Sequence, residues 1–254
     1  MKVKNIVGIK YMSIAILFMV FAMGCSAQRE AEKGWKNYKV LVGKIIPPTF
    51  PNKDFSILDY GAKAGGSTDC LPAIKSAIDA CNKAGGGRVM IPAGTFFVKG
   101  PIHLLSNVNL HLDDKAILKF STNDDDYLPN VVTRFEGVEL MNYSPLVYAY
   151  GQTNIAVTGK GTLDGQADNE HWWNWTGSKR FGWKEGMPKQ HDPENEPKLM
   201  QMAAEGVPVE DRVFGKGYYM RPTMVEFYKC KNILIEGVTL INAPFWLIHP
   251  TLSQ

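Results

Sequence analysis

The clearest hydrophobic pattern in the chain is a short stretch that occurs three times. Each copy begins with Asn, continues with a β-branched residue and has an aliphatic residue two places further on. Residues i and i+2 of a strand point to the same face, so these aliphatic side chains are expected to stack on equivalent residues of neighbouring coils. The pattern therefore predicts an all-β chain wound as a solenoid. The three copies are Asn107-Val108-Asn109-Leu110, Asn154-Ile155-Ala156-Val157 and Asn232-Ile233-Leu234-Ile235.

The spacing between these rungs predicts long insertions. The first two copies are 47 residues apart and the last two are 78 residues apart, so parts of the chain must leave the coil between rungs. The largest insertion is expected at residues 168–220. Within it, residues 196–205 are typical of a short helix, which Gly206-Val207-Pro208 would end.

The region ahead of the rungs predicts a strand, a helix and then more strands. A strand is expected at residues 55–60, before a turn at Gly61. Thr68 or Asp69 is expected to cap a helix that carries Pro72 in its first turn and ends at Gly85-Gly86-Gly87. Such a helix would cover the apolar open end of the first coil. Its apolar stripe consists of Ile74, Ala77, Ile78 and Cys81, and the following strands are expected at residues 88–91, 95–98 and 102–105.

The first 28 residues indicate a bacterial secretory signal. Three Lys precede an uncharged apolar run at residues 11–24, and Cys25-Ser26-Ala27-Gln28 follows. A retained membrane anchor is the alternative, but the apolar run is shorter than the ~20 residues of a spanning helix. Cys25 after Gly24 predicts lipidation at Cys25, with ordinary cleavage near Ala27 as the alternative. The protein is thus expected to be exported to the periplasm, the outer membrane or the outside of a bacterium, and to contact a membrane only through that lipid.

Composition indicates one globular domain after a linker. The chain is 45% hydrophobic and 21% charged, which is typical of a folded protein. Residues 25–52 contain scattered Lys and a Pro cluster and are expected to be a linker, so the domain occupies residues 53–254. Loss of residues 1–24 removes three Lys and takes the net charge from +3 to zero, which gives no reason to expect a nucleic-acid partner.

The cysteines of the domain are expected to be free thiols. Cys70 and Cys81 fall on one predicted helix about 16 Å apart, which is too far for a disulfide. Cys230 is left to pair with either of them only if the fold brings it close.

The acidic residues give weak candidates for catalysis. Asp124-Asp125-Asp126 is more typical of a solvated loop than of a general acid and base, and Asp164 lies in an Asp-Gly turn. The sequence contains no His pair at helical spacing, no Cys-x-x-Cys and no phosphate-binding Gly loop followed by Lys. No metal and no cofactor are therefore expected.

Two aromatic stretches are better candidates for binding. Trp172, Trp173, Trp175 and Trp183 lie near Lys179, Arg180 and Lys184, and flat rings with cations suit an acidic polysaccharide. The alternative is that these Trp pin the insertion to the solenoid. Downstream, Trp246 and His249 are candidates to line a groove, or else are structural. Strand alternation places Trp246 and Ile248 on one face and His249 on the other.

These residues together resemble a family. The N-terminal part of the domain resembles the first coil of pectin-acting β-helix proteins, a coil that pectate-lyase-like proteins and phage tailspikes share. The resemblance lies in Phe55 to Ala62, Thr68-Asp69, Gly85-Gly86-Gly87 and Pro92-Ala93-Gly94. Two further parts of the sequence resemble the polygalacturonases of glycoside hydrolase family 28. One is the segment from Gly159 to Gly165 with Trp172-Trp173, and the other is Arg221-Pro222 with the segment from Asn242 to Pro250. The resemblance covers residues 53–250. It implies a right-handed parallel β-helix that hydrolyses pectin with inversion, in an exo-acting form.

The resemblance supplies no catalytic residue. The family's Asn-x-Asp, Asp-Asp, His-Gly and Arg-x-Lys set follows the counterpart of His249-Pro250, and this chain contains neither His-Gly nor Arg-x-Lys. Asn123-Asp124-Asp125 fits Asn-x-Asp only by chance, since it lies far upstream. The expectation is an incomplete solenoid, the N-terminal part of a pectinase, that is inactive by itself and poorly soluble. The substrate-binding candidates are Trp172, Trp173, Arg180, Trp246 and His249.

Two other functions stay open. One is a non-catalytic polysaccharide-binding or tailspike-like module, although a tailspike would not need the secretory signal. The other is a lyase, which would use Ca²⁺ and a basic residue, but no acidic cluster here suits Ca²⁺. The substrate itself is left open between polygalacturonate and rhamnogalacturonan.

Overall fold

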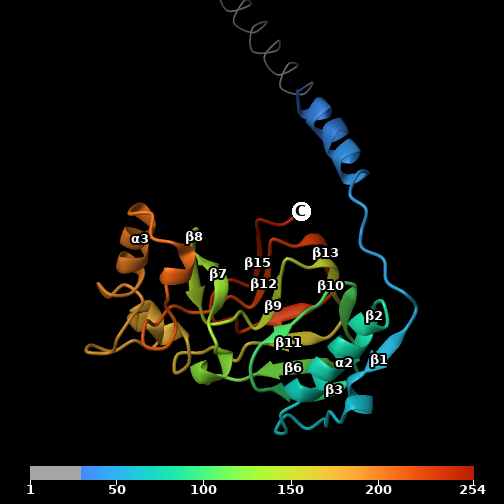
Figure 1. Cartoon of the computed structure of the whole chain (residues 1–254), viewed down its shortest axis with the longest axis horizontal. Coiled ribbons are helices and arrows are strands. Elements are labelled where there is room, and N and C mark those ends of the chain that lie inside the picture. The colour runs from blue at the N-terminus through green and yellow to red at the C-terminus, as the bar shows by residue number, and fades with distance from the viewer. Residues whose placement is uncertain (1–29) are drawn as a thin grey trace, which may run out of the picture. The chain divides into compact units, whose positions relative to one another are not determined.

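Parallel strands stack into three sheets in a computed structural model that describes residues 30–254 (Figure 1). Each coil contributes one strand to each sheet, and adjacent coils pair in parallel. The chain is therefore a right-handed parallel β-helix, as the sequence predicts. The first sheet contains β1 (Asp54–Ser56), β2 (Gly87–Ile91), β5 (Val108–Leu112), β10 (Thr153–Gly159) and β13 (Lys231–Glu236). The second contains β3 (Gly94–Val98), β6 (Ala116–Phe120), β11 (Thr162–Asp164) and β14 (Thr239–Ile241), and the third contains β4 (Ile102–His103), β9 (Val147–Tyr150), β12 (Val225–Tyr228) and β15 (Ile248–Thr251).

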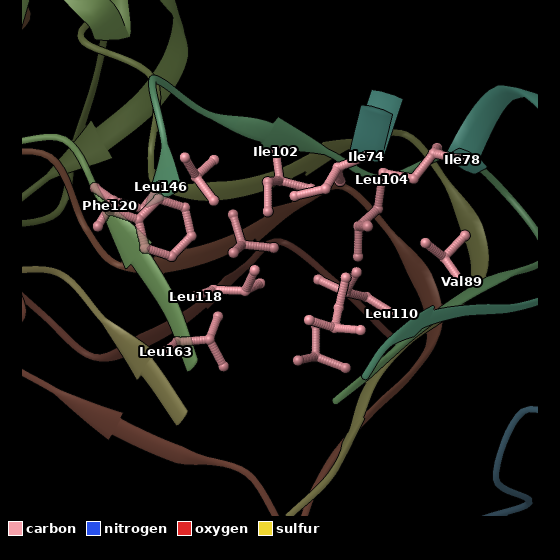
Figure 2. Close-up of a cluster of buried hydrophobic side chains, with 14 of the residues drawn as sticks. Ile74, Ile78, Val89, Ile102, Leu104, Leu110, Leu118, Phe120, Leu146 and Leu163 are labelled. Atoms are coloured by element: carbon pink, nitrogen blue, oxygen red, sulfur yellow. The ribbon is translucent and has the colours of Figure 1, made fainter. Parts of the chain in front are cut away.

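The core consists of aliphatic columns that run across the coils. Strand register places Val89, Leu110, Val157 and Ile235 in one column. Figure 2 shows side chains of different sheets, such as Leu110, Leu118 and Ile102, pointing into one interior space. Fully burying one such side chain contributes roughly 1.5–3 kcal/mol. The i, i+2 pattern of the three rungs is confirmed by these columns.

An asparagine ladder leads into the first sheet. Asn107, Asn154 and Asn232 have φ of 65°, 54° and 55°, a left-handed conformation that Asn tolerates better than most residues. The Asn154 Nδ2 atom donates to Asn107 Oδ1 at 3.2 Å, and Asn232 Nδ2 donates to Asn154 Oδ1 at 2.6 Å. The repeated Asn thus marks the bend before each rung. The next bend needs Gly159, where φ is +113° and a Cβ would collide with the backbone oxygen of Leu112.

Helix α2 (Leu71–Lys83) packs against β1, β2 and β4 and covers the first coil. Its predicted apolar stripe is buried. The N-cap residue is Cys70 and not Thr68 or Asp69, although the Asp69 Oδ1 atom accepts from the Leu71 amide at 2.9 Å. Two predicted strands are shorter than expected. Residues 57–60 form η1 (Ile57–Tyr60), because Ser56 accepts from the Leu58 amide, and β4 stops at His103.

Two insertions leave the coils on one side of the molecule (Figure 1). The first carries η2 (Asp124–Tyr127) and the antiparallel hairpin of β7 (Val131–Phe135) and β8 (Val138–Asn142). The second, at residues 165–224, contains the predicted helix as α3 (Glu196–Ala204). Its other elements are η3 (Trp173–Thr176), η4 (Lys179–Phe181) and η5 (Val209–Asp211). A separate apolar cluster of Phe135, Leu140, Leu199, Phe214 and Met220 packs α3 against the hairpin.

The compact solenoid unit is Pro47–Gln254, and the preceding residues form a unit of their own. Within the predicted linker, residues 30–42 are helical and exposed. The secretory signal and Cys25 lie outside the described residues. Among the helices of residues 30–254, none has the length and apolar character needed to cross a bilayer. Cys70, Cys81 and Cys230 are buried free thiols, as expected, and burial raises the pKa of Cys81 to about 11.

Candidate functional site

A row of polar side chains lies on the outer face of the third sheet. Strand register aligns His103, Tyr148, Glu226 and His249 on four successive coils. Their neighbours along the strands, such as Val147 and Val225, point into the core, so the row faces outward. The rings of His103 and Tyr148 meet edge to face at 5.3 Å. We refer to these four residues as the outer row.

The β7–β8 hairpin covers the middle of the outer row. The Tyr148 hydroxyl donates to the Val132 carbonyl oxygen at 2.5 Å, and the Thr133 hydroxyl donates to Glu226 Oε2 at 2.6 Å. Burial, followed by the charge of Glu226, raises the pKa of Tyr148 well above its ordinary value. Tyr148 therefore stays a neutral hydrogen-bond donor at physiological pH.

The Glu226 carboxylate is fully buried, with 0% of the residue exposed. Its Oε2 atom also accepts from the Thr223 hydroxyl at 2.9 Å, and His249 Nδ1 lies 3.4 Å from the same oxygen. Within residues 30–254, neither Glu226 Oε1 nor His249 Nδ1 makes a hydrogen bond. A buried carboxylate is costly unless it is paired, so the nearby imidazole is its natural partner.

Aromatic rings surround the exposed end of the outer row. The rings of Phe135, Phe245 and Trp246 stack in sequence with 4.9 Å between neighbouring centroids. The His249 ring meets Trp246 edge to face at 4.7 Å, and Trp246 is 42% exposed. The site thus offers a flat aromatic surface next to an imidazole.

Arg221 holds the loop that carries these rings. Its guanidinium lies 4.8 Å from the centre of the Phe245 ring, and its Nη1 atom donates to the Pro244 carbonyl oxygen at 2.9 Å. Its Nη2 atom donates to Gln190 Oε1 at 3.0 Å. Burial lowers the pKa of Arg221 to about 10, against the opposing charges of Glu136 and Glu196, so the group stays charged at neutral pH.

A pocket of about 400 Å³ lies beside this loop. Its lining is mostly apolar and combines the second insertion with the last coil. Trp173 contributes to it and is fixed by a hydrogen bond of 2.9 Å from its Nε1 atom to the Ala243 carbonyl oxygen. The other lining residues include Thr176, Phe181, Arg221, Leu240, Asn242, Phe245 and Leu247.

The structure brings some predicted site residues together and separates others. Trp246 and His249 are in contact, because β15 begins at Ile248 and strand alternation does not extend back to Trp246. Trp173 reaches the pocket, whereas Arg180 is exposed with its guanidinium 5.5 Å from the Phe181 ring. The prediction for Trp172 is wrong, since it is only 2% exposed and packs against Tyr127 of the first insertion and Trp175 of the second.

The acidic candidates have structural partners. Asp124 accepts from Tyr143, Asp125 pairs with Lys216, and Asp126 accepts from Ser121. Asp164 accepts from the Gln166 amide and from Asn242 Nδ2, as its turn position indicates. The residue that sequence reasoning missed is Glu226. Its signal was an acid flanked by apolar residues in Val225-Glu226-Phe227.

Comparison with known proteins identifies relatives of this architecture. The family described as rhamnogalacturonase A/epimerase, pectate lyase-like, matches residues 55–131. The solved structure of a hyperthermoactive exopolygalacturonase from Thermotoga maritima is 52% identical with a TM-score of 0.81, over 85% of this chain and 47% of that one. A probable polygalacturonase from Vitis vinifera is 26% identical over 208 residues, which is 78% of this chain and 34% of that protein.

A third relative is the exo-poly-α-D-galacturonosidase of Dickeya chrysanthemi. It is 36% identical over 121 residues, which is 44% of this chain and 19% of that protein. The chain thus spans less than half the length of these relatives.

Proposed function

We propose that this chain serves in an exported glycosidase that hydrolyses galacturonosyl linkages of pectin in an exo-acting manner. The chain resembles the N-terminal region of a polygalacturonase-like parallel β-helix of glycoside hydrolase family 28. The observation that carries the proposal is the 52% identity to an exopolygalacturonase over 85% of this chain. A pectic polysaccharide is then the partner.

The surface around Trp246 and His249 supports a sugar-binding role. An exposed indole face packs well against the apolar face of a pyranose, and an imidazole beside it donates to a hydroxyl or a carboxylate. We assign Trp246, His249 and Trp173 to substrate binding, with Arg180 at the margin. Pectin fits this surface because its galacturonosyl residues carry a carboxylate.

Inverting hydrolysis needs a carboxylic acid and a carboxylate about 6.5–9.5 Å apart at an open site. In the described part of the chain, the carboxylate at the outer row is Glu226, which is buried and engaged. We therefore propose that residues 1–254 alone bind pectin and do not cleave it.

The test compares the 254-residue chain with the product of the longest reading frame that contains it. Both are expected to bind polygalacturonate, and only the longer product is expected to release reducing ends. Neutral galactan is the control ligand. Release of reducing ends by the 254-residue chain would contradict the proposal that this chain does not cleave pectin. Binding of polygalacturonate without release of reducing ends by either protein would indicate a polysaccharide-binding module.

Binding is tested residue by residue with Trp246→Ala. Loss of the indole face is expected to weaken polygalacturonate binding roughly fivefold in titration calorimetry. Trp35→Ala is the matched control, because Trp35 is exposed on the separate N-terminal unit. Equal affinities for wild type and Trp246→Ala would remove this surface from the site.

Export and lipidation at Cys25 form part of the proposal. They rest on the charged, then apolar, residues ahead of Cys25. Mass spectrometry of the mature protein is expected to show a chain that begins at acylated Cys25. A mature N-terminus after Ala27 would replace lipidation with ordinary secretion.

A further inference from the structure

Glu226 and His249 are the neighbours in the outer row that each carry a buried polar atom without a hydrogen-bond partner within residues 30–254. In residues 30–254, the salt bridge that Glu226 makes is with His249, at 3.4 Å between Oε2 and Nδ1. Glu226 Oε1 and His249 Nδ1 are without hydrogen bonds in that part of the chain. The imidazole is therefore the ionisable group that lies next to the buried carboxylate.

Two threonine hydroxyls fix the carboxylate oxygen that lies next to the imidazole. Thr133, on the hairpin, and Thr223, at the end of the second insertion, both donate to Glu226 Oε2. Two hydroxyl donors on one oxygen fix the position of that oxygen. Glu226 Oε2 is thus held in place beside His249 Nδ1.

A carboxylate next to Nδ1 places the imidazole proton on that nitrogen and fixes the orientation of the ring. No hydrogen bond to His249 Nε2 occurs within the residues that the structure describes, and the side chain is 14% exposed. Nε2 is therefore left for a ligand. When the ring carries its second proton, Nε2–H becomes a charged donor that matches a carboxylate.

We propose that Glu226 is a positioning residue that, through His249, makes the site selective for uronate sugars over neutral sugars. The sugar ring lies on Trp246 and its carboxylate accepts from His249 Nε2. This assignment rests on the proposed function, since it takes Trp246 and His249 as the sugar-binding surface. Glu226 thus contributes to selectivity without itself touching the sugar.

The experiment uses the full chain and two ligands, digalacturonate and its neutral methyl ester. Wild type is expected to prefer digalacturonate. Glu226→Gln keeps the size of the side chain and its acceptance from the two Thr hydroxyls but removes the charge. It is expected to weaken digalacturonate binding about tenfold and to leave binding of the ester unchanged.

Glu139→Gln is the matched control. Glu139 also lies under an outward strand residue, since it accepts from the Tyr228 hydroxyl, but the contacts of its carboxylate do not include His249. This variant should retain the wild-type preference. Equal weakening for both ligands in Glu226→Gln, or an unchanged preference, would overturn the proposal.

A spectroscopic readout separates positioning from general stability. In ¹⁵N NMR spectra, the His249 ring nitrogens of wild type should report a proton on Nδ1, and Glu226→Gln should shift this signature. If Glu226→Gln fails to fold, Thr133→Val can be used instead, because it removes one donor to the carboxylate. Thr133→Val is expected to reduce the preference for digalacturonate over its ester in part. An unreduced preference would overturn the proposal. If wild type binds neither ligand, the proposed function fails, while the NMR signature still decides whether Glu226 orients His249.

Discussion

At Arg221 a buried positive charge is held by a carbonyl oxygen, a side-chain amide and an aromatic face. The planar guanidinium supplies all three contacts at once, two as hydrogen bonds and one by lying over Phe245. A lysine ammonium keeps the charge but not the fork or the stacking. At the scale of the residue, the position of the aromatic loop thus depends on one side chain.

Arg221→Lys should therefore destabilise the protein by about 1–3 kcal/mol, since hydrogen bonds to a buried charge are lost. Urea unfolding at neutral pH measures the change. Lys198→Gln is the control, because Lys198 is an exposed partner of Glu194, and it should leave the unfolding midpoint unchanged. An unfolding midpoint for Arg221→Lys equal to that of wild type would show that the loop is held by other contacts.

His103 predicts a pH dependence of stability. Partial desolvation of the ring, in a residue that keeps exposed surface, followed by the charge of Lys75, lowers its pKa from the ordinary 6.5. The unfolded chain therefore binds a proton at a higher pH than the folded protein does, and the contribution of His103 to stability is lost as pH falls below about 6.5. His103→Gln, which lacks this titration, should lose less stability than wild type between pH 7 and pH 5. Parallel losses in urea unfolding would count against this assignment.

At the scale of the element, the rungs depend on bends that begin with Asn. Each Asn adopts positive φ, and each amide bonds the amide of the next coil. Asn154 is the middle member and makes two of these bonds. The ladder therefore couples the backbone conformation of one coil to that of the next.

Asn154→Ala removes both amide bonds and places a Cβ where φ is positive, so it should cost about 2–3 kcal/mol. Asn154→Gly relieves the backbone strain but not the lost bonds, and should recover about 1 kcal/mol of that. Urea unfolding of both variants separates the cost of the backbone strain from the cost of the lost hydrogen bonds. Equal free energies for the Ala and Gly variants would show that positive φ is not strained here.

The rungs could be predicted from sequence because alternation depends on residues two places apart. The inward columns, the capping helix α2 and the helix α3 follow from such local patterns. The site could not be predicted in the same way. Glu226 is covered by Thr133, which lies 93 residues earlier, and Trp172 of the second insertion packs against Tyr127 of the first. No local pattern records those contacts.

At the scale of the whole molecule, the last coil exposes apolar side chains. Ile241, Leu247, Ile248 and Leu252 are 40–58% exposed, although Ile248 continues a core column that includes Val225. Purified residues 1–254 should therefore associate as concentration rises. Sedimentation velocity measures this, and Ile248→Glu should reduce association whereas Ile45→Glu, on the N-terminal unit, should not. A chain that stays monomeric at high concentration would contradict the expectation.

Residues 30–254 also contain two apolar clusters, the solenoid core and the smaller cluster that holds α3 to the hairpin. Leu110 and Val157 are neighbours in one column, while Leu199 belongs to the second cluster. Leu110→Ala should cost about 2–5 kcal/mol. The change in unfolding free energy of the Leu110→Ala, Val157→Ala double variant should differ from the sum of the single changes by about 0.5 kcal/mol or more. The reason is that each substitution alters the cavity that the other creates. Leu110→Ala and Leu199→Ala should instead add within about 0.5 kcal/mol, since they share no contacts. Double-mutant cycles in urea decide between these outcomes, and strong coupling of Leu110 to Leu199 would mean that solenoid and insertions form a single core.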